Sequence, residues 1–336
     1  MRARAAAAAG GTPLLCGVLL LDKPPGITSS RALQRVRALY RAARAGHTGA
    51  LDPLATGVLP ICLGEATKFS AYFLQGDKTY EACATLGVRT DTLDAEGSVI
   101  SRQDPGCAHE HLAAVLPRFC GSIMQLPPRY SALKLRGRPL YSYARAGEEV
   151  ELRARSVTIR ALELLGHDRL GFRIRVLCSG GTYIRSLIDD IGQALGCGAH
   201  LSSLRRLSVQ GLPDAPLHGL QELQELTAAS GGQAPAHLLL PLSTALAALP
   251  RLQLTCTAAR RLHCGQVQEL SAALADGAGI PPQSGVLYLA CGGDFLGVGR
   301  LEDGVIRPLR MMSAPLAEGA LLVGGGGADM TAAERT

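Results

Sequence analysis

Runs and alternations of apolar residues predict a protein built largely from β-strands. Residues 78–86 alternate between polar and apolar positions, which is the pattern of a half-buried strand, and this strand carries Tyr80. Residues 17–21 form a short apolar run that ends at a turn, Asp-Lys-Pro-Pro-Gly, as expected for a buried strand. Further strands are predicted at 157–165 and 171–178, a hairpin joined by residues 166–168, and at 204–209.

Apolar residues at helical spacing predict a smaller number of helices. The clearest helix spans residues 182–195, where one stripe is formed by Ile184, Leu187, Ile188, Ile191 and Leu195. Arg185 lies next to that stripe in the first turn, so it needs a carboxylate partner, because a buried ion left without its partner costs about 3–5 kcal/mol. Ser29 or Ser30 is expected to cap a helix that runs to Tyr40, and another helix is predicted at 65–74.

The pattern changes along the second half of the chain. Residues 213–248 are helical or linker-like, and short strands separated by turns follow from about residue 249, which predicts a small all-β domain. The domain prediction is a flexible N-terminal tail at 1–14, a large first domain at 15–248, the small domain at 249–312 and a disordered tail at 313–336. No internal repeat is evident.

Composition adds limits on the partners of the chain. Its 336 residues are 47% hydrophobic, which is ample for a large core, but only 4% aromatic with no Trp. A nucleic-acid partner would therefore be bound through charge and shape rather than by base stacking. The net charge is +6, and two stretches without acidic residues, 24–51 and 112–147, carry five and six basic residues. Such segments suit a polyanion, although each by itself is also typical of a solvated helix face.

Cysteine usage and the N-terminal region indicate a cytoplasmic protein. The ten cysteines show no Cys-x-x-Cys pair and no metal-ligand spacing, which predicts free thiols in a reducing cytosol, without disulfides or zinc. The apolar run at 14–21 is too short to cross a membrane, and no cleavage-like site follows it. An organellar transit peptide remains an alternative interpretation, although residues 1–11, with two arginines and no serine, support it only weakly.

The most informative segment is residues 46–60, GHTGALDPLATGVLP, named here the Asp52 loop. Three glycines and two prolines in fifteen residues exclude a regular helix and impose fixed turns. They hold a single carboxylate, Asp52, among apolar side chains, a setting suited to nucleophilic or acid–base chemistry. An ordinary Asp-Pro turn, in which the side chain accepts a backbone N–H, is the alternative interpretation.

Several separated motifs, in order, resemble the TruB-type tRNA pseudouridine synthases. The resemblance covers about residues 15–312. The motifs are LLDKPPGITS at 20–29, the Asp52 loop continued to Ser70 with GEATKF at 64–69, KTY at 78–80, GVRTDTLD at 87–94, QLPPRYSALK at 125–134, CSGGTYIR at 178–185 and GCGAHL at 196–201.

The resemblance implies a fold and an activity. The expected fold is mixed α/β (α+β), with a mostly antiparallel central sheet in the catalytic domain and a small, reduced PUA-like domain after it. The implied reaction converts uridine 55 in the T loop of tRNA to pseudouridine, and it uses no cofactor and no metal. The implied partner is the T arm of tRNA, with no membrane and no obligatory protein partner, and a monomer is the default state.

Site residues are likewise implied by the motif positions. Asp52 matches the catalytic carboxylate, which either attacks C1′ or removes a proton to give a glycal, and the sequence leaves both routes open. Arg185 matches its ion-pair partner, expected to keep the carboxylate pKa low, and Tyr80 matches the tyrosine that stacks on the uracil. His47 matches the wedge that replaces the flipped base. The remaining expected substrate contacts are Tyr183 and Leu204 at the pocket, Lys23 beside it, and Lys134 and Arg145 in the RNA-clasping loop, residues 128–156.

Two other functions compete with a stand-alone synthase. An RNA-binding or tRNA-folding protein without catalysis would be expected to lack part of the set Asp52, Tyr80 and Arg185, which is intact here. A guide-RNA-dependent relative in a multi-protein complex would be expected to carry a fuller C-terminal domain. The sequence therefore favours the stand-alone enzyme.

Overall fold

The structure is a computed structural model that describes residues 15–74, 76–106, 108–275 and 284–313. The described chain forms two compact units, which divide between Pro241 and Leu242, several residues before the predicted boundary after residue 248. The predicted tail at 1–14 and all but the first residue of the predicted tail at 313–336 lie outside the described residues.

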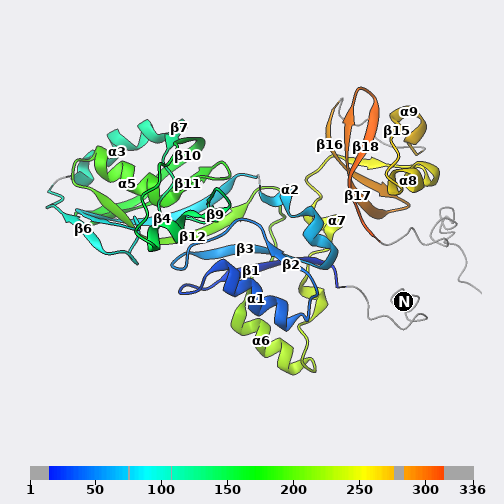
Figure 1. The fold of residues 1–336 in the computed structure, drawn as a ribbon, viewed down its shortest axis with the longest axis horizontal. Helices are drawn as coiled ribbons and strands as arrows, with labels where there is room; N and C mark the ends of the chain where they lie inside the picture. The colour runs from blue at the N-terminus through cyan, green and yellow to red at the C-terminus, as the bar shows by residue number, and fades with distance from the viewer. Residues whose placement is uncertain (1–14, 75, 107, 276–283, 314–336) are drawn as a thin grey trace, which may run out of the picture. The chain divides into compact units, whose positions relative to one another are not determined.

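A nine-stranded sheet forms the centre of the first unit (Figure 1). Eight strands follow the order β13–β1–β3–β12–β4–β11–β10–β7, and β2 pairs with β3 beside that path. Only the β1–β13 and β3–β12 pairs are parallel, so the prediction of a mixed, mostly antiparallel sheet is confirmed. The strands are β1 (Gly17–Lys23), β2 (Ala45–His47), β3 (Thr56–Leu63), β4 (Lys78–Leu86), β7 (Gly121–Gln125), β10 (Arg155–Asp168), β11 (Gly171–Cys178), β12 (Ala199–Val209) and β13 (His218–Gly219).

Two pairs of short strands lie outside this sheet. They are the hairpins β5 (Val88–Thr90) with β6 (Val99–Arg102) and β8 (Lys134–Leu135) with β9 (Arg138–Pro139). The second hairpin belongs to the RNA-clasping loop, which also contains helix α4 (Leu140–Arg145).

Helices pack against the sheet with the apolar stripes that the sequence predicts. The α5 helix (Ile184–Ala194) lies against β12 and buries Leu187, Ile188 and Ile191 in the main core. The α1 helix (Ser29–Leu39) lies beside α6 (Leu220–Ala229) next to β1 and β3 (Figure 1). Its cap is Thr28, whose hydroxyl accepts from the Arg31 N–H, rather than the predicted Ser29 or Ser30. Ser29 is instead buried, where its hydroxyl bonds the Leu51 backbone.

The remaining helices of the first unit are short. The predicted helix at 65–74 is instead a 3₁₀ helix that begins at Gly64, followed after Ser70 by one α-helical turn. These elements are η1 (Gly64–Phe69), α2 (Ala71–Leu74), η2 (Ala108–His111), α3 (Leu112–Val115), η3 (Leu116–Phe119) and η4 (Ala236–Leu238).

The second unit is a small β-rich domain with its own apolar core. Its five strands follow the order β14–β16–β17–β18–β15. Two helices that the sequence pattern did not predict, α8 and α9, complete the unit together with α7. The elements are α7 (Leu242–Ala245), β14 (Arg251–Gln253), α8 (Cys256–His263), β15 (Gln268–Glu269), α9 (Leu270–Ala273), β16 (Gly285–Cys291), β17 (Asp294–Glu302) and β18 (Val305–Met311).

Candidate active site

A pocket of about 260 Å³ in the first unit gathers five of the predicted site residues. The Asp52 loop forms one wall, and the strands β4 and β12 and the start of α5 form the others. The predicted residues that line it are Asp52, Tyr80, Tyr183, Arg185 and Leu204. Segments far apart in sequence thus meet at one place, as a reaction centre requires.

Arg185 holds the Asp52 carboxylate in a two-pronged ion pair. The guanidinium Nε lies 2.9 Å from Asp52 Oδ2, and Nη2 donates to Oδ1 at 3.0 Å. The Arg185 side chain is 4% exposed, whereas the Asp52 side chain is 36% exposed and so remains open to the pocket. The pair therefore places a fixed, reachable carboxylate at the pocket wall, and the predicted partnership is present.

The same guanidinium serves a second carboxylate and two backbone carbonyls. Its Nη1 lies 3.3 Å from Oδ2 of Asp94, whose side chain is 4% exposed, and donates to the Thr92 carbonyl. Its Nη2 also donates to the Tyr130 carbonyl at 2.9 Å. Arg185 thus links the Asp52 loop, the turn before Asp94 and the start of the RNA-clasping loop.

The acidity of Asp52 differs from the expectation. Burial raises the pKa of Asp52 above its ordinary value, and the nearby Asp94 charge raises it further. The Arg185 guanidinium and, more weakly, Lys23 lower the pKa, but they do not cancel the effect of burial. The expectation that Arg185 keeps this pKa low was wrong, because the effect of burial is larger than the opposing effect of the Arg185 guanidinium.

Tyr80 lies on β4 with 7% of its surface exposed, and it lines the same pocket. Burial raises the pKa of its hydroxyl, and the positive charge of Arg206 opposes that effect. Strand register places Tyr80 directly opposite Arg206 of β12.

Tyr183 and Leu204 complete the pocket from α5 and β12. The Tyr183 backbone is fixed in both directions by Gln125, whose side-chain amide accepts from the Tyr183 N–H and donates to its carbonyl. Leu204 is 7% exposed and belongs to the main hydrophobic core, at the point where that core borders the pocket. Both residues therefore shape the cavity.

Lys23 and His47 lie beside the pocket rather than in its lining. The Lys23 side chain is fully buried, and its Nζ donates to the carbonyls of Pro24, Ile27 and Pro53, which ties β1 to the residue after Asp52. Burial lowers its pKa to about 8. His47 is half-buried on β2, and its Nδ1 has no hydrogen-bond partner among the residues that the structure describes. Burial and the Arg206 charge lower its pKa.

Lys134 and Arg145 lie on the RNA-clasping loop, outside the pocket. Both are exposed, and the Arg145 guanidinium stacks 5.5 Å from the ring centroid of Tyr141. The structure therefore divides the predicted set into a pocket group, a supporting group and a surface group.

Sequence reasoning did not assign three residues that belong to the pocket or to its ion pairs. Asp94 pairs with Arg185, and Arg206 and Lys78 line the pocket. Arg206 could have been found from the alternation in the strand predicted at 204–209, because Leu204 and Arg206 share one face. Asp94 lies in the motif at 87–94, but nothing in that segment identifies its partner.

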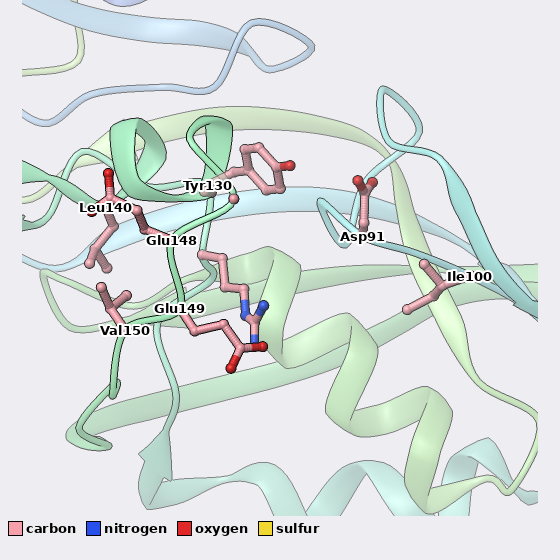
Figure 2. A pocket seen from close by; sticks show the side chains of 10 residues that line it. Asp91, Ile100, Tyr130, Leu140, Glu148, Glu149 and Val150 are labelled. Carbon is pink, nitrogen blue, oxygen red and sulfur yellow. The ribbon is translucent and has the colours of Figure 1, made fainter.

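A larger pocket of about 380 Å³ lies elsewhere in the first unit (Figure 2). It is lined by Asp91 and Ile100 from the region of the β5–β6 hairpin and by Tyr130, Glu148 and Glu149 from the RNA-clasping loop. None of the predicted site residues lines it. The pocket that holds Asp52 is therefore the candidate active site.

Two other features of the described residues bear on the expectations. Among residues 15–74, 76–106, 108–275 and 284–313, no group of three or more His, Cys, Asp or Glu side chains could hold a metal ion. Of the helices in the described part of the chain, none is long and apolar enough to cross a membrane.

Comparison with protein families gives two adjacent matches. The N-terminal domain of the TruB family pseudouridylate synthases matches residues 37–184, and the C-terminal domain of tRNA pseudouridylate synthase B matches residues 185–247.

Similar proteins and structures agree with these matches. The tRNA pseudouridine synthase B of Chromohalobacter salexigens is 49% identical over 305 residues, which cover 90% of this chain and 96% of that protein. The enzyme of the same name from Aeromonas salmonicida is 47% identical, with 88% of this chain and 93% of that protein covered.

Among solved structures, a chain of a Cbf5–Nop10–Gar1 complex aligns with a TM-score of 0.67 and 25% identity, covering 89% of this chain and 85% of that chain. A chain of an H/ACA ribonucleoprotein bound to a substrate RNA containing 2′-deoxyuridine has the same TM-score and 24% identity, covering 90% and 86%. The second likeness supports the fold alone.

Proposed function

We propose that this chain, which belongs to the TruB family of pseudouridylate synthases, isomerises uridine 55 in the T loop of tRNA to pseudouridine. Its activity is that of a tRNA pseudouridine synthase, an isomerase. The observation that carries the proposal is the Asp52 carboxylate, which Arg185 holds at the wall of a pocket that also contains Tyr80.

The reaction needs an ionised carboxylate next to the target ribose. The N1–C1′ bond breaks, the uracil turns, and a C5–C1′ bond forms while the C5 proton leaves and N1 gains one. Asp52 either attacks C1′ or removes a ribose proton to give a glycal, and in both routes it acts as an anion. The two-pronged contact with Arg185 favours that anion and fixes its direction.

Tyr80 and the pocket walls have complementary roles in this proposal. Tyr80 stacks on the uracil, and its phenolate accepts the C5 proton. Leu204 and Tyr183 enclose the base on its other sides. Because the pocket is too narrow for a duplex, the nucleotide must be flipped out of the folded loop, at a cost of a few kcal/mol. His47, beside the pocket and deprotonated because its pKa is lowered, fills the space that the base leaves.

Recognition outside the pocket rests on charge and shape. Lys134 and Arg145 project from the RNA-clasping loop, where they are free to contact phosphates. We expect a monomer that acts in the cytoplasm and needs no protein partner. The 47–49% identity to proteins named tRNA pseudouridine synthase B supports this, since the chain of the Cbf5–Nop10–Gar1 complex is only 25% identical.

Mapping the modified nucleotide tests this proposal. An unmodified tRNA transcript, the same transcript with cytidine at position 55, and an isolated T-arm hairpin would be treated with the enzyme. Pseudouridine would be located by carbodiimide modification and primer extension. We expect a single product at position 55 of the tRNA and at the matching uridine of the hairpin, and none in the cytidine transcript. Modification at another position would contradict the proposal. Modification of the whole tRNA but not of the hairpin would contradict recognition of the T arm alone.

A further inference from the structure

Arg206 is a buried cation at the pocket that has no role in the reaction proposed above. It lies on β12, lines the pocket together with Asp52 and Tyr80, and is 1% exposed. Within the described residues, no carboxylate lies within 4.0 Å of its guanidinium. A buried charge without a counter-ion costs several kcal/mol in an apolar interior, so its contacts must repay that cost.

Its hydrogen bonds join the two limbs of the Asp52 loop. The Nε donates to the Val58 carbonyl at 2.7 Å, and Nη2 donates to the Gly49 carbonyl at 3.0 Å. Gly49 precedes Asp52 and Val58 follows it. One guanidinium therefore fixes the distance between the two ends of the segment that presents the carboxylate.

The backbones of β3 and β12 approach each other closely at Gly57 and Arg206. Gly57 pairs with Arg206 in the parallel β3–β12 register and has φ +94°. A Cβ at position 57 would lie 2.1 Å from the Arg206 carbonyl oxygen, so only glycine allows the two strands to approach so closely. The side chain and the backbone of Arg206 thus hold the same limb of the loop.

Arg206 also faces Tyr80 across the strand pair. The two residues are register partners on β12 and β4, so their side chains share one face of the sheet. The charge of Arg206 lowers the pKa of Tyr80, whereas burial, which is the larger effect, and the charges of Cys178 and Asp52 raise it. Arg206 is the cation among these neighbours, and it favours the phenolate that would accept the C5 proton.

We propose that Arg206 is a positioning residue for the isomerisation: it clamps the Asp52 loop from both sides and holds a positive charge against Tyr80. The inference rests on the proposed function, because the roles of Asp52 and Tyr80 are part of that proposal. Arg206 acts through these two side chains: its hydrogen bonds to the Asp52 loop go to backbone carbonyls, and its hydrogen bond and charge both lower the pKa of Tyr80.

Three variants test this role: Arg206→Gln, Arg206→Lys and, as a matched control, Arg205→Gln. Arg205 is the preceding residue of β12, points to the other face and pairs with the exposed Asp22. Single-turnover tritium release from T-arm RNA labelled with [5-³H]uridine gives the rate constant at saturating enzyme and the half-saturation concentration. Thermal unfolding of each variant is measured in parallel.

We expect Arg206→Gln to lower the saturated rate constant by about 100-fold, as small misplacements of reacting groups do, with half-saturation changed less than about threefold. Arg206→Lys keeps the charge and one carbonyl contact, so it should recover about tenfold of that loss and remain about tenfold slower than the wild type. Arg205→Gln should match the wild type. The rise of the rate with pH, which reports Tyr80 deprotonation, should move to higher pH in Arg206→Gln and not in Arg206→Lys.

Other outcomes would overturn this role. A wild-type rate constant in Arg206→Gln, or a loss confined to half-saturation, would exclude positioning. If Arg206→Gln fails to fold, Arg206→Lys decides: a folded Arg206→Lys with no loss of rate, or with a loss equal to complete inactivation, contradicts the role. A wild-type enzyme that releases no tritium would instead overturn the proposed function, so the two failures are distinguishable.

Discussion

Arg185 binds both oxygens of Asp52 and at the same time lies 3.3 Å from Asp94, so one buried cation serves two carboxylates. The Asp94 side of this triad is closed to solvent, whereas the Asp52 side opens to the pocket. This asymmetry fits the proposed function, in which Asp52 is the reactive carboxylate and Asp94 a structural one. The triad therefore links the stability of the first unit to the geometry of its reaction.

Replacing Arg185 by Met should abolish activity and destabilise the fold. It leaves Asp52 and Asp94 facing each other without a cation, and the loss of one partner of a buried ion pair costs about 3–5 kcal/mol. Urea unfolding and tritium release would measure the two effects. The double variant Arg185→Met/Asp94→Asn removes one of the stranded charges, so it should regain part of the stability but no activity. Full stability in the single variant would contradict this account of the triad.

The acid side of the pH–rate profile should report Asp52. Because burial and the Asp94 charge raise the pKa of Asp52 above 3.8, activity should fall as the pH drops through a value above that of an ordinary aspartate. Asp94→Asn removes one charge that raises this pKa, so the fall should move to lower pH.

Asp91→Asn is the control for that shift, since Asp91 lies three residues earlier and is not among the groups that change the Asp52 pKa. Single-turnover rates between about pH 4.5 and 8 would be compared after circular dichroism has verified folding. A shift in Asp91→Asn but not in Asp94→Asn would refute the assignment.

Removing Lys134 or Arg145 should weaken RNA binding without slowing the bound reaction. Both side chains are exposed on the RNA-clasping loop and away from the pocket. If each contacts one phosphate, its alanine variant should reduce the slope of log affinity against log salt by about 1, with an unchanged rate at saturation.

Arg175→Ala is the matched control for this measurement, because Arg175 is already paired with Glu81 and Glu163. Filter binding at several salt concentrations, with Asp52→Asn present in every variant, would give the slopes. Equal slopes for the Lys134, Arg145 and Arg175 variants would exclude the proposed phosphate contacts.

Local patterns predicted most of the helices and strands because the spacing of apolar residues follows the buried face of each element. The strand at 78–86 and the helix around Ile184–Ala194 follow this rule within a few residues. The cap of α1 could not be assigned by composition alone, since Thr28, Ser29 and Ser30 all have the required hydroxyl. A tertiary contact selects Thr28 as the cap, because the Ser29 hydroxyl is buried and hydrogen-bonded to the Leu51 backbone.

The candidate site was predicted where family motifs mark it and missed where only the fold brings residues together. Asp52 and Arg185 are 133 positions apart, and their contact matches the expectation. The Asp94 contact with Arg185 and the Arg206 clamp on Gly49 and Val58 depend on strand register, which a sequence pattern does not specify. The raised Asp52 pKa follows mainly from burial, and the missed second carboxylate raises it further; both depend on the tertiary fold.

The most direct test of the central claim compares the wild type with Asp52→Asn in tritium release from T-arm RNA labelled with [5-³H]uridine. Folding raises the pKa of Asp52, so the ionised carboxylate makes the folded state less stable at neutral pH. Replacing Asp52 by the neutral Asn should therefore not lower the free energy of unfolding. We predict rapid release by the wild type, none by Asp52→Asn, and equal RNA binding by both. Release by a stably folded Asp52→Asn would contradict the claim that Asp52 carries the reaction.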